Sequence, residues 1–173
     1  PRIWPSGPMI SQTSGHSDFR GVTDLPSSAN RQPPPGVRFG YNAVADGVEE
    51  VHRLVREQLL QGASQIKLAL GGGVSSNYDP IDVTEYTPEE VRAAVADAEN
   101  WGTYVCVHAY TPRAIRMAIE AGVKCIEHGQ LLDEPTMQML ADKGVWLSTQ
   151  PFLDDEDRIP TAPGSANEKK YQK

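Results

Sequence analysis

Short apolar runs that alternate with helix-like segments constrain the fold of this chain more than any other feature. Residues 46–150 repeat this alternation, and each run is short enough for a strand buried on both faces. The predicted strands of this region are 65–70, 103–107, 123–127 and 145–149. Such strands with helices between them are typical of a parallel sheet. The sequence predicts an α/β fold, either an open doubly wound sheet or part of a (β/α)8 TIM barrel.

The predicted helices between these strands begin at capping residues, and each is followed by a glycine. Thr87 and Glu90 are expected to form a capping box, and Asp46 and Glu49 a second one. The other helix starts and stops are expected at Thr111, Asp133, Gly62, Gly102, Gly122 and Gly144.

The two flanks differ in composition from this β/α core. Residues 1–45 are rich in proline, glycine and serine, which predicts a loop-rich entry with one short strand at 8–11. Residues 151–173 form a polar tail that ends like the start of a helix. We expect 1–173 to be a single partial domain. The first residue is a proline, so we also expect the chain to be a piece of a longer protein.

Charge and hydropathy exclude several classes of protein. The formal net charge of −7 argues against a nucleic-acid partner, which would require a basic face. No apolar stretch approaches the length of a membrane span, and the first residues do not resemble a signal peptide. Cys106 and Cys125 lack metal-binding spacing and are expected to be buried thiols. A cytoplasmic location is the default expectation.

Two histidines occupy matched positions in successive strand segments. His108 follows the predicted strand 103–107, and His128 follows 123–127. The carboxyl ends of neighbouring parallel strands lie about 4.8 Å apart at one edge of the sheet. Two imidazoles placed there suit a shared metal ion. The alternative is that each is a structural histidine at a strand end.

Lys67 lies inside the apolar segment QIKLAL. A buried lysine is costly unless it loses its charge or finds a partner, so it is either a salt-bridged residue or a functional one. The glycine-rich segment 71–76 follows, but it lacks the phosphate-binding pattern GxxxxGK[ST].

Four stretches, taken together, resemble the amidohydrolase superfamily of metal-dependent hydrolases, especially its imidazolonepropionase-like and Xaa-Pro dipeptidase-like members. They are spread over almost the whole chain in the family's order. The stretches are SGHSDFR, GASQIKLALGGGVSS, VHAYTPRAIRMAIEAGVKCIEHGQLLDE and GVWLSTQP.

The resemblance implies a distorted TIM barrel with one or two divalent metals, for which zinc is the expected ion, and hydrolysis of a peptide or cyclic amide by a metal-activated hydroxide. It implies that CO2 carboxylates Lys67, and that Lys67, His108 and His128 are metal ligands. It further implies that His16 and Tyr110 bind the substrate, a small molecule or a dipeptide.

The chain also departs from the family. Its sequence has no His-x-His pair and no aspartate in the context of the family's eighth strand, so no catalytic residue is assigned. We expect strands three to seven of the barrel, an open arc that could associate with another copy or a complementing chain. Three hypotheses remain: part of an amide hydrolase, a truncated homologue that only binds a metal or a carboxylate ligand, or an unrelated α/β domain with structural histidines.

Overall fold

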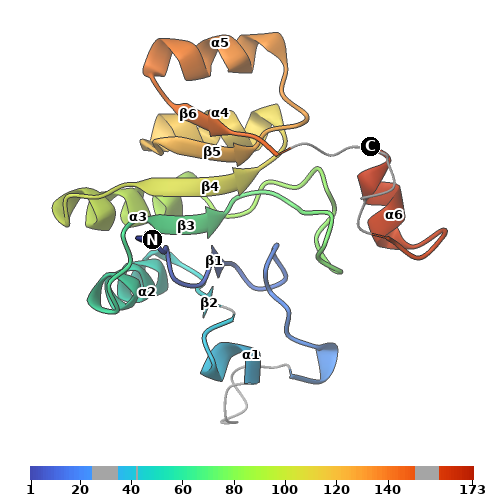
Figure 1. Ribbon diagram of the computed structural model, residues 1–173, viewed down its shortest axis with the longest axis horizontal. Coiled ribbons are helices and arrows are strands. Elements are labelled where there is room, and N and C mark those ends of the chain that lie inside the picture. The colour runs from blue at the N-terminus through green and yellow to red at the C-terminus, as the bar shows by residue number, and fades with distance from the viewer. Residues whose placement is uncertain (25–34, 42, 151–159) are drawn as a thin grey trace.

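A parallel sheet forms the centre of the computed structural model, which describes residues 1–24, 35–41, 43–150 and 160–173. Its strand order is β2-β1-β3-β4-β5-β6 (Figure 1). The strands are β1 (Ile10–Ser11), β2 (Ala43–Val44), β3 (Ile66–Ala69), β4 (Val105–Ala109), β5 (Cys125–His128) and β6 (Trp146–Ser148). The helices are α1 (Pro35–Arg38), α2 (Val48–Leu60), α3 (Pro88–Asn100), α4 (Pro112–Ala121), α5 (Glu134–Lys143) and α6 (Ala166–Tyr171), with a short 3-10 turn at Val22–Asp24.

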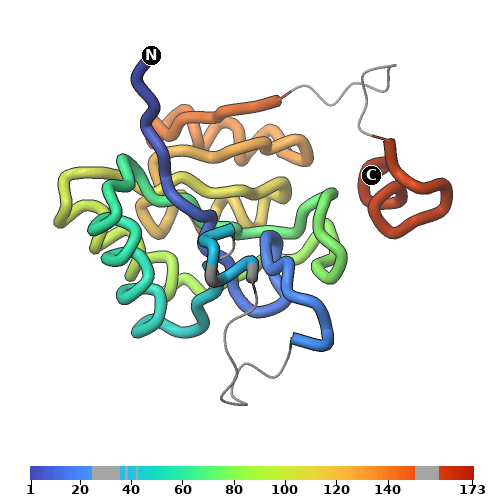
Figure 2. The backbone as a smooth tube through the Cα atoms, turned by 60° about the horizontal axis from the view of Figure 1, so that its bottom comes forward, coloured from blue at the N-terminus to red at the C-terminus, as the bar shows by residue number. Residues whose placement is uncertain are grey.

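The winding of the sheet distinguishes the two predicted architectures. From β3 to β6 each strand lies next to the following one, with α3, α4 and α5 in the connections. Helix α2 contacts α3, α3 contacts α4, and α4 contacts α5, so the helices form one layer (Figure 2). A doubly wound sheet would place helices on both faces. The fold is therefore the partial (β/α)8 barrel, and the doubly wound alternative is wrong.

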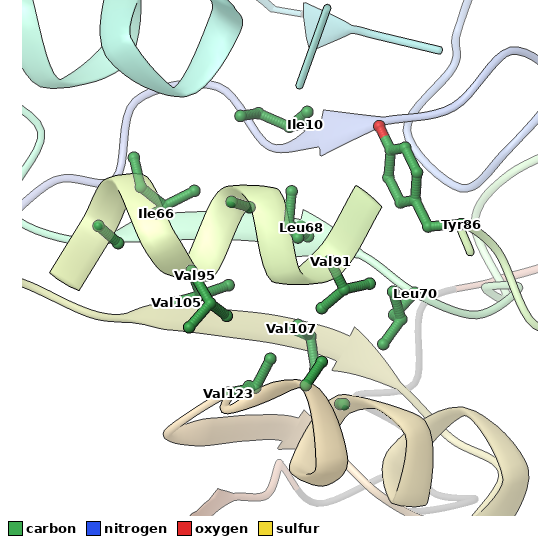
Figure 3. Close-up of a cluster of buried hydrophobic side chains, with 14 of the residues drawn as sticks. Ile10, Ile66, Leu68, Leu70, Tyr86, Val91, Val95, Val105, Val107 and Val123 are labelled. Carbon is green, nitrogen blue, oxygen red and sulfur yellow. The ribbon is translucent and has the colours of Figure 1, made fainter. Parts of the chain in front are cut away.

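The hydrophobic core fills the space between the sheet and this helix layer. Ile66, Leu68, Val105 and Val107 point from β3 and β4 toward Val91 of α3 and its neighbours (Figure 3). Successive side chains of a strand point to opposite faces. The alternate residues therefore face away from the helices; they are Lys67, Cys106, His108, Cys125 and Glu127. This polar face, which we call the inner face, carries the candidate site.

The second predicted capping box is absent. Helix α3 has the expected box between Thr87 and Glu90, but the N-cap of α2 is Gly47, which provides no side-chain hydrogen bond. The Asp46 carboxylate instead accepts hydrogen bonds from the backbone N–H and the hydroxyl of Thr13, at 2.9 and 2.6 Å. The Asp46–Glu49 prediction is wrong because the Asp46 carboxylate binds Thr13, and the Asp46 backbone N–H donates to Glu50 Oε2 at 3.0 Å and not to Glu49.

Differences from the predicted boundaries are small. Strand β4 extends to Ala109, so His108 lies inside the strand and does not follow it. Strand β2 was not predicted, because two residues carry no periodic signal. Parts of the entry and of the tail, 25–34, 42 and 151–159, lie outside the described residues.

Cys106 is buried and Cys125 is partly exposed, and both are free thiols. Among the described residues, no helix combines the length and the apolar character needed to span a bilayer.

Candidate functional site

The imidazoles of His108 and His128 meet at the carboxyl edge of the sheet. Strands β4 and β5 pair in parallel with Ala109 opposite His128, and the two ring centroids are 4.6 Å apart. His128 has a φ of 79°, an uncommon value for a residue with a side chain. This conformation ends β5 and turns the chain. The structure thus brings the two predicted ligands together.

Two further rings complete a cluster at this edge. His16, from the loop after β1, stacks on His108 with 3.9 Å between the centroids. Tyr110, directly after β4, lies 4.9 Å from the His108 ring and 5.5 Å from the His128 ring. Burial raises the pKa of the Tyr110 phenol to about 12, so it stays protonated and can donate a hydrogen bond. The four rings gather from three separate segments of the chain.

Buried polar groups fix the position of the His16 loop. The backbone N–H of His16 donates to Glu85 Oε1 at 2.8 Å, and a Cβ on the adjacent Gly15 would overlap Glu85 Oε2. The ring Nδ1 of His16 is 2.8 Å from the hydroxyl of Ser76. Ser76 also donates to Asp79 Oδ2 at 2.7 Å. Glu85, Ser76 and Asp79 were not predicted, since loop residues joined by long-range contacts leave no pattern in the sequence.

The hydrogen bonds of the two strand-end histidines leave nitrogen lone pairs available. His108 Nε2 lies 3.0 Å from the carbonyl oxygen of Gly72, so this nitrogen carries the hydrogen and Nδ1 carries the lone pair. His128 Nδ1 is buried and has no hydrogen-bond partner among the described residues. Burial lowers the pKa of both imidazoles, that of His108 to about 2. Both rings are therefore neutral, the form that binds metals.

Lys67 lies on the inner face, on the strand next to His108. Its Nζ is 3.6 Å from Glu127 Oε2, which matches the salt-bridged reading of this residue. Burial lowers the pKa of the amine. Its charge also depresses the pKa of both strand-end histidines, an effect secondary to their burial. Lys67 is thus electrostatically coupled to the ring cluster.

The side chains of His108, His128 and Lys67 provide some, but not all, of the ligands that a metal centre needs. Within the described ranges, no three histidine, cysteine, aspartate or glutamate side chains converge closely enough to hold a metal. Two imidazole lone pairs are present, and a third ligand would have to come from a modified Lys67. A hydrogen bond from the second ring nitrogen to a carbonyl, as His108 makes to Gly72, is the usual support of a metal-binding histidine.

Comparison with known proteins identifies the family of this chain. The model of the amidohydrolase family matches residues 1–169. This chain belongs to the amidohydrolase family. Among individual amidohydrolases, it is 36% identical over 149 residues to ochratoxinase of Aspergillus niger, an alignment that covers 84% of this chain and 31% of the relative.

Two solved amidohydrolase structures superpose on the same region. A prolidase complexed with N-methylphosphonate-L-proline is 45% identical with a TM-score of 0.77, covering 85% of this chain and 35% of that one. A Xaa-Pro dipeptidase with bound methionine in its active site is 33% identical with a TM-score of 0.71, covering 85% and 34%. The chain therefore spans about a third of the length of these amidohydrolases.

Proposed function

We propose that this chain forms part of a metal-dependent hydrolase that cleaves an amide bond in a small molecule or a dipeptide. The observation that carries the proposal is the convergence of three histidines and a tyrosine at the carboxyl edge of a partial barrel. Burial lowers the pKa of His16 to about 4, so this ring is neutral like the other two. In barrels of this kind the catalytic groups gather at that edge. Membership of the amidohydrolase family supports the same class of reaction.

The ligands of the related structures support the substrate class. Methionine and N-methylphosphonate-L-proline, named with the two relatives, both carry a carboxylate. Tyr110 keeps its hydroxyl hydrogen and can donate it to such a carboxylate or to the scissile carbonyl. His16 stacks beside the candidate ligand His108 and would border the same substrate. We therefore favour a dipeptide with a free carboxylate, with His16 and Tyr110 as its contacts.

His108, His128 and Lys67 would hold the metal, for which zinc is our candidate. Two nitrogens support this assignment. Nδ1 of His108 keeps its lone pair because Nε2 bonds Gly72, and Nδ1 of His128 has no hydrogen-bond partner among the described residues. A divalent metal, when bound, polarises a carbonyl and activates water as a nucleophile. The remaining ligands would come from parts of the longer relatives that this chain does not include, or from a second chain.

Lys67 would bind the metal as a carbamate. The neutral amine attacks CO2, a C–N bond forms, one proton leaves, and the product is an anionic oxygen ligand. Burial favours the neutral amine that this reaction needs, whereas the ion pair with Glu127 favours the ammonium form. Incubation with carbon-13 bicarbonate should produce a carbamate signal in the NMR spectrum that is lost in Lys67→Met.

The decisive experiment measures metal bound per chain after purification in the presence of zinc and bicarbonate. We expect about one zinc per chain in the unmodified protein and less than about 0.2 in His108→Ala or His128→Ala, because a half-site that loses a ligand binds too weakly. His52→Ala, a histidine of α2 outside the ring cluster, is the matched control and should keep its zinc. Equal zinc in all four proteins, or none in any, would contradict the assignment.

A hydrolysis assay with Xaa-Pro dipeptides then separates the two remaining hypotheses. Turnover that depends on zinc and on His108 supports the hydrolase. Zinc bound without turnover supports the alternative of a truncated homologue that only binds a metal or a carboxylate ligand.

A further inference from the structure

The glycine-rich turn after β3 touches both histidines of the stacked pair. The carbonyl oxygen of Gly72 accepts a hydrogen bond from His108. At Gly73 the backbone lies so close to the His16 ring that a Cβ there would overlap the imidazole. Residues 72–76, which we call the glycine turn, therefore form a wall against which both rings pack.

A buried carboxylate holds the glycine turn from within. Asp79 Oδ2 accepts hydrogen bonds from the N–H of Gly73 at 2.6 Å and from the hydroxyl of Ser76 at 2.7 Å. The single hydrogen of the Ser76 hydroxyl has two acceptors, Asp79 Oδ2 at 2.7 Å and the carbonyl oxygen of Gly73 at 3.2 Å. The Ser76 oxygen therefore accepts from His16 Nδ1, 2.8 Å away. Asp79 and Ser76 thus connect the shape of the turn to the orientation of the His16 ring.

Helix α6 holds the same turn from the outside. In Figures 1 and 2 this helix, drawn in red, lies next to the green segment that contains the glycine turn. Lys170 Nζ donates to the carbonyl oxygens of Gly73 and Ser76, at 2.9 and 2.8 Å. Asn167 Nδ2 donates to the carbonyl oxygen of Val74 at 2.6 Å. Two side chains of α6 thus bind three carbonyl groups of a turn that lies more than 90 residues away in sequence.

The charge of Lys170 has a second partner inside the fold. The Asp79 side chain is only 2% exposed, and its Oδ1 has no hydrogen bond among the described residues. Lys170 Nζ lies 3.8 Å from this oxygen. A buried carboxylate is costly without a compensating charge, so loss of Lys170 would disturb both the carbonyl groups and Asp79.

We propose that Lys170 and Asn167 are positioning residues that act from α6 through the glycine turn, and that they hold the His16 ring against His108. The importance of this arrangement for catalysis rests on the proposed function, whereas the coupling between α6 and His16 does not. Among the described residues no hydrogen bond joins either side chain to the four rings, and the charge of Lys170 acts on His16 only from a distance, so neither is a catalytic residue.

The test is an NMR measurement of the imidazole nitrogens in the metal-free 173-residue chain labelled with nitrogen-15 histidine. The His16 signals are assigned by their loss in His16→Gln. In Lys170→Met we expect the Nδ1 signal of His16 to shift, because its bond to Ser76 is disturbed, while the His52 signals stay unchanged. Lys169→Met, an exposed neighbour on the same helix with the same change in charge, should leave all signals in place.

Further variants keep the test decisive. Lys170→Arg retains a cationic donor and should restore most of the His16 signal position. If Lys170→Met does not fold, Asn167→Ala decides, because it removes one bond to the turn without leaving a buried charge unpaired. Unchanged His16 signals in the folded variants of both residues would overturn the proposal.

A kinetic measurement connects this coupling to the proposed hydrolase. Lys170→Met should lower kcat/KM about 10- to 100-fold relative to Lys169→Met. Losses of this size are typical when a residue that orients a side chain of the active site, here His16, is removed. If the unmodified chain binds no zinc and has no hydrolase activity, the proposed function fails but the NMR result still stands, so the two failures are distinguishable. Equal kcat/KM in the two variants of an active enzyme would contradict the positioning role.

Discussion

The buried carboxyl group of Glu85 contacts the His16 loop. Its side chain is 1% exposed, and one of its oxygens has no hydrogen-bond partner among the described residues. Burial raises its pKa from 4.5 to about 8. At neutral pH this group is therefore a carboxylic acid that accepts a hydrogen bond from the His16 backbone through its other oxygen.

The protonation of Glu85 predicts how stability depends on pH. The unfolded chain releases this proton near pH 4.5, whereas the folded chain keeps it to about pH 8. Retention of this proton contributes to the free energy of unfolding. The contribution is fully present below pH 4.5 and is lost as the pH rises to about 8. Glu85→Gln keeps the acceptor and removes the titration, so the free energy of unfolding of the variant should fall less over this range, by on the order of 5 kcal/mol. Urea unfolding at several pH values measures the difference.

The control for this prediction is Glu120→Gln, an exposed residue of α4, which should follow the pH dependence of the unmodified protein. If Glu85→Gln also follows it, Glu85 ionises normally and the reading of its environment is wrong.

Residues differ in how far the sequence could predict their roles. His108 and His128 could be placed because strands and helices alternate regularly, and Lys67 because a lysine inside an apolar run is unusual. His16 and Tyr110 depended on family resemblance. The supports of His16, namely Glu85, Ser76, Asp79 and Lys170, could not be predicted, because their contacts join segments far apart in the chain and follow no period.

At the scale of elements, one carboxylate connects the starts of two helices. Glu90 accepts the backbone N–H of Thr87 through Oε2 and the N–H of Gly47 through Oε1, each at 2.7 Å. It therefore completes the capping box of α3 and also binds the residue that precedes α2. Local sequence patterns predicted the first of these bonds and missed the second, which depends on how α2 packs against α3.

This shared role predicts unequal effects for two similar substitutions. Glu90→Ala should lower the free energy of unfolding by about 1–2 kcal/mol, because two helix starts lose an acceptor. Glu49→Ala, in the exposed first turn of α2, should change it by less than about 0.5 kcal/mol. Equal effects of the two substitutions in denaturant titrations would show that the bond to Gly47 contributes nothing.

At the scale of the whole molecule, the sheet has two open edges among the described residues, at β2 and β6. All three residues of β6 are exposed, and Trp146 is 77% exposed. An unpaired apolar edge strand favours association with another chain. The sequence predicted this open arc because the chain contained too few strand segments to close a barrel.

We therefore expect the isolated chain to self-associate as its concentration rises. Trp146→Lys should weaken this association, because a charge at the edge strand opposes pairing. Trp101→Lys changes a tryptophan of similar exposure at the end of α3, away from the edge, and should have no such effect. Sedimentation velocity over a concentration series measures both. A chain that stays monomeric throughout, or equal association of both variants, would contradict the prediction.

The segment from β4 through α4 to β5 carries His108, Tyr110 and His128 in one continuous β-α-β unit. The pairing of adjacent strands sets the distance between the two histidines, and the loops that carry His16 and the glycine turn have no part in that pairing. Mutations in the His16 loop can therefore change the proposed substrate contact while His108 and His128 keep their spacing, whereas mutations in the glycine turn also reach the His108 ring through Gly72. The distance between His108 and His128 is thus a property of the β-α-β unit, and the position of His16 is a property of the loops around it.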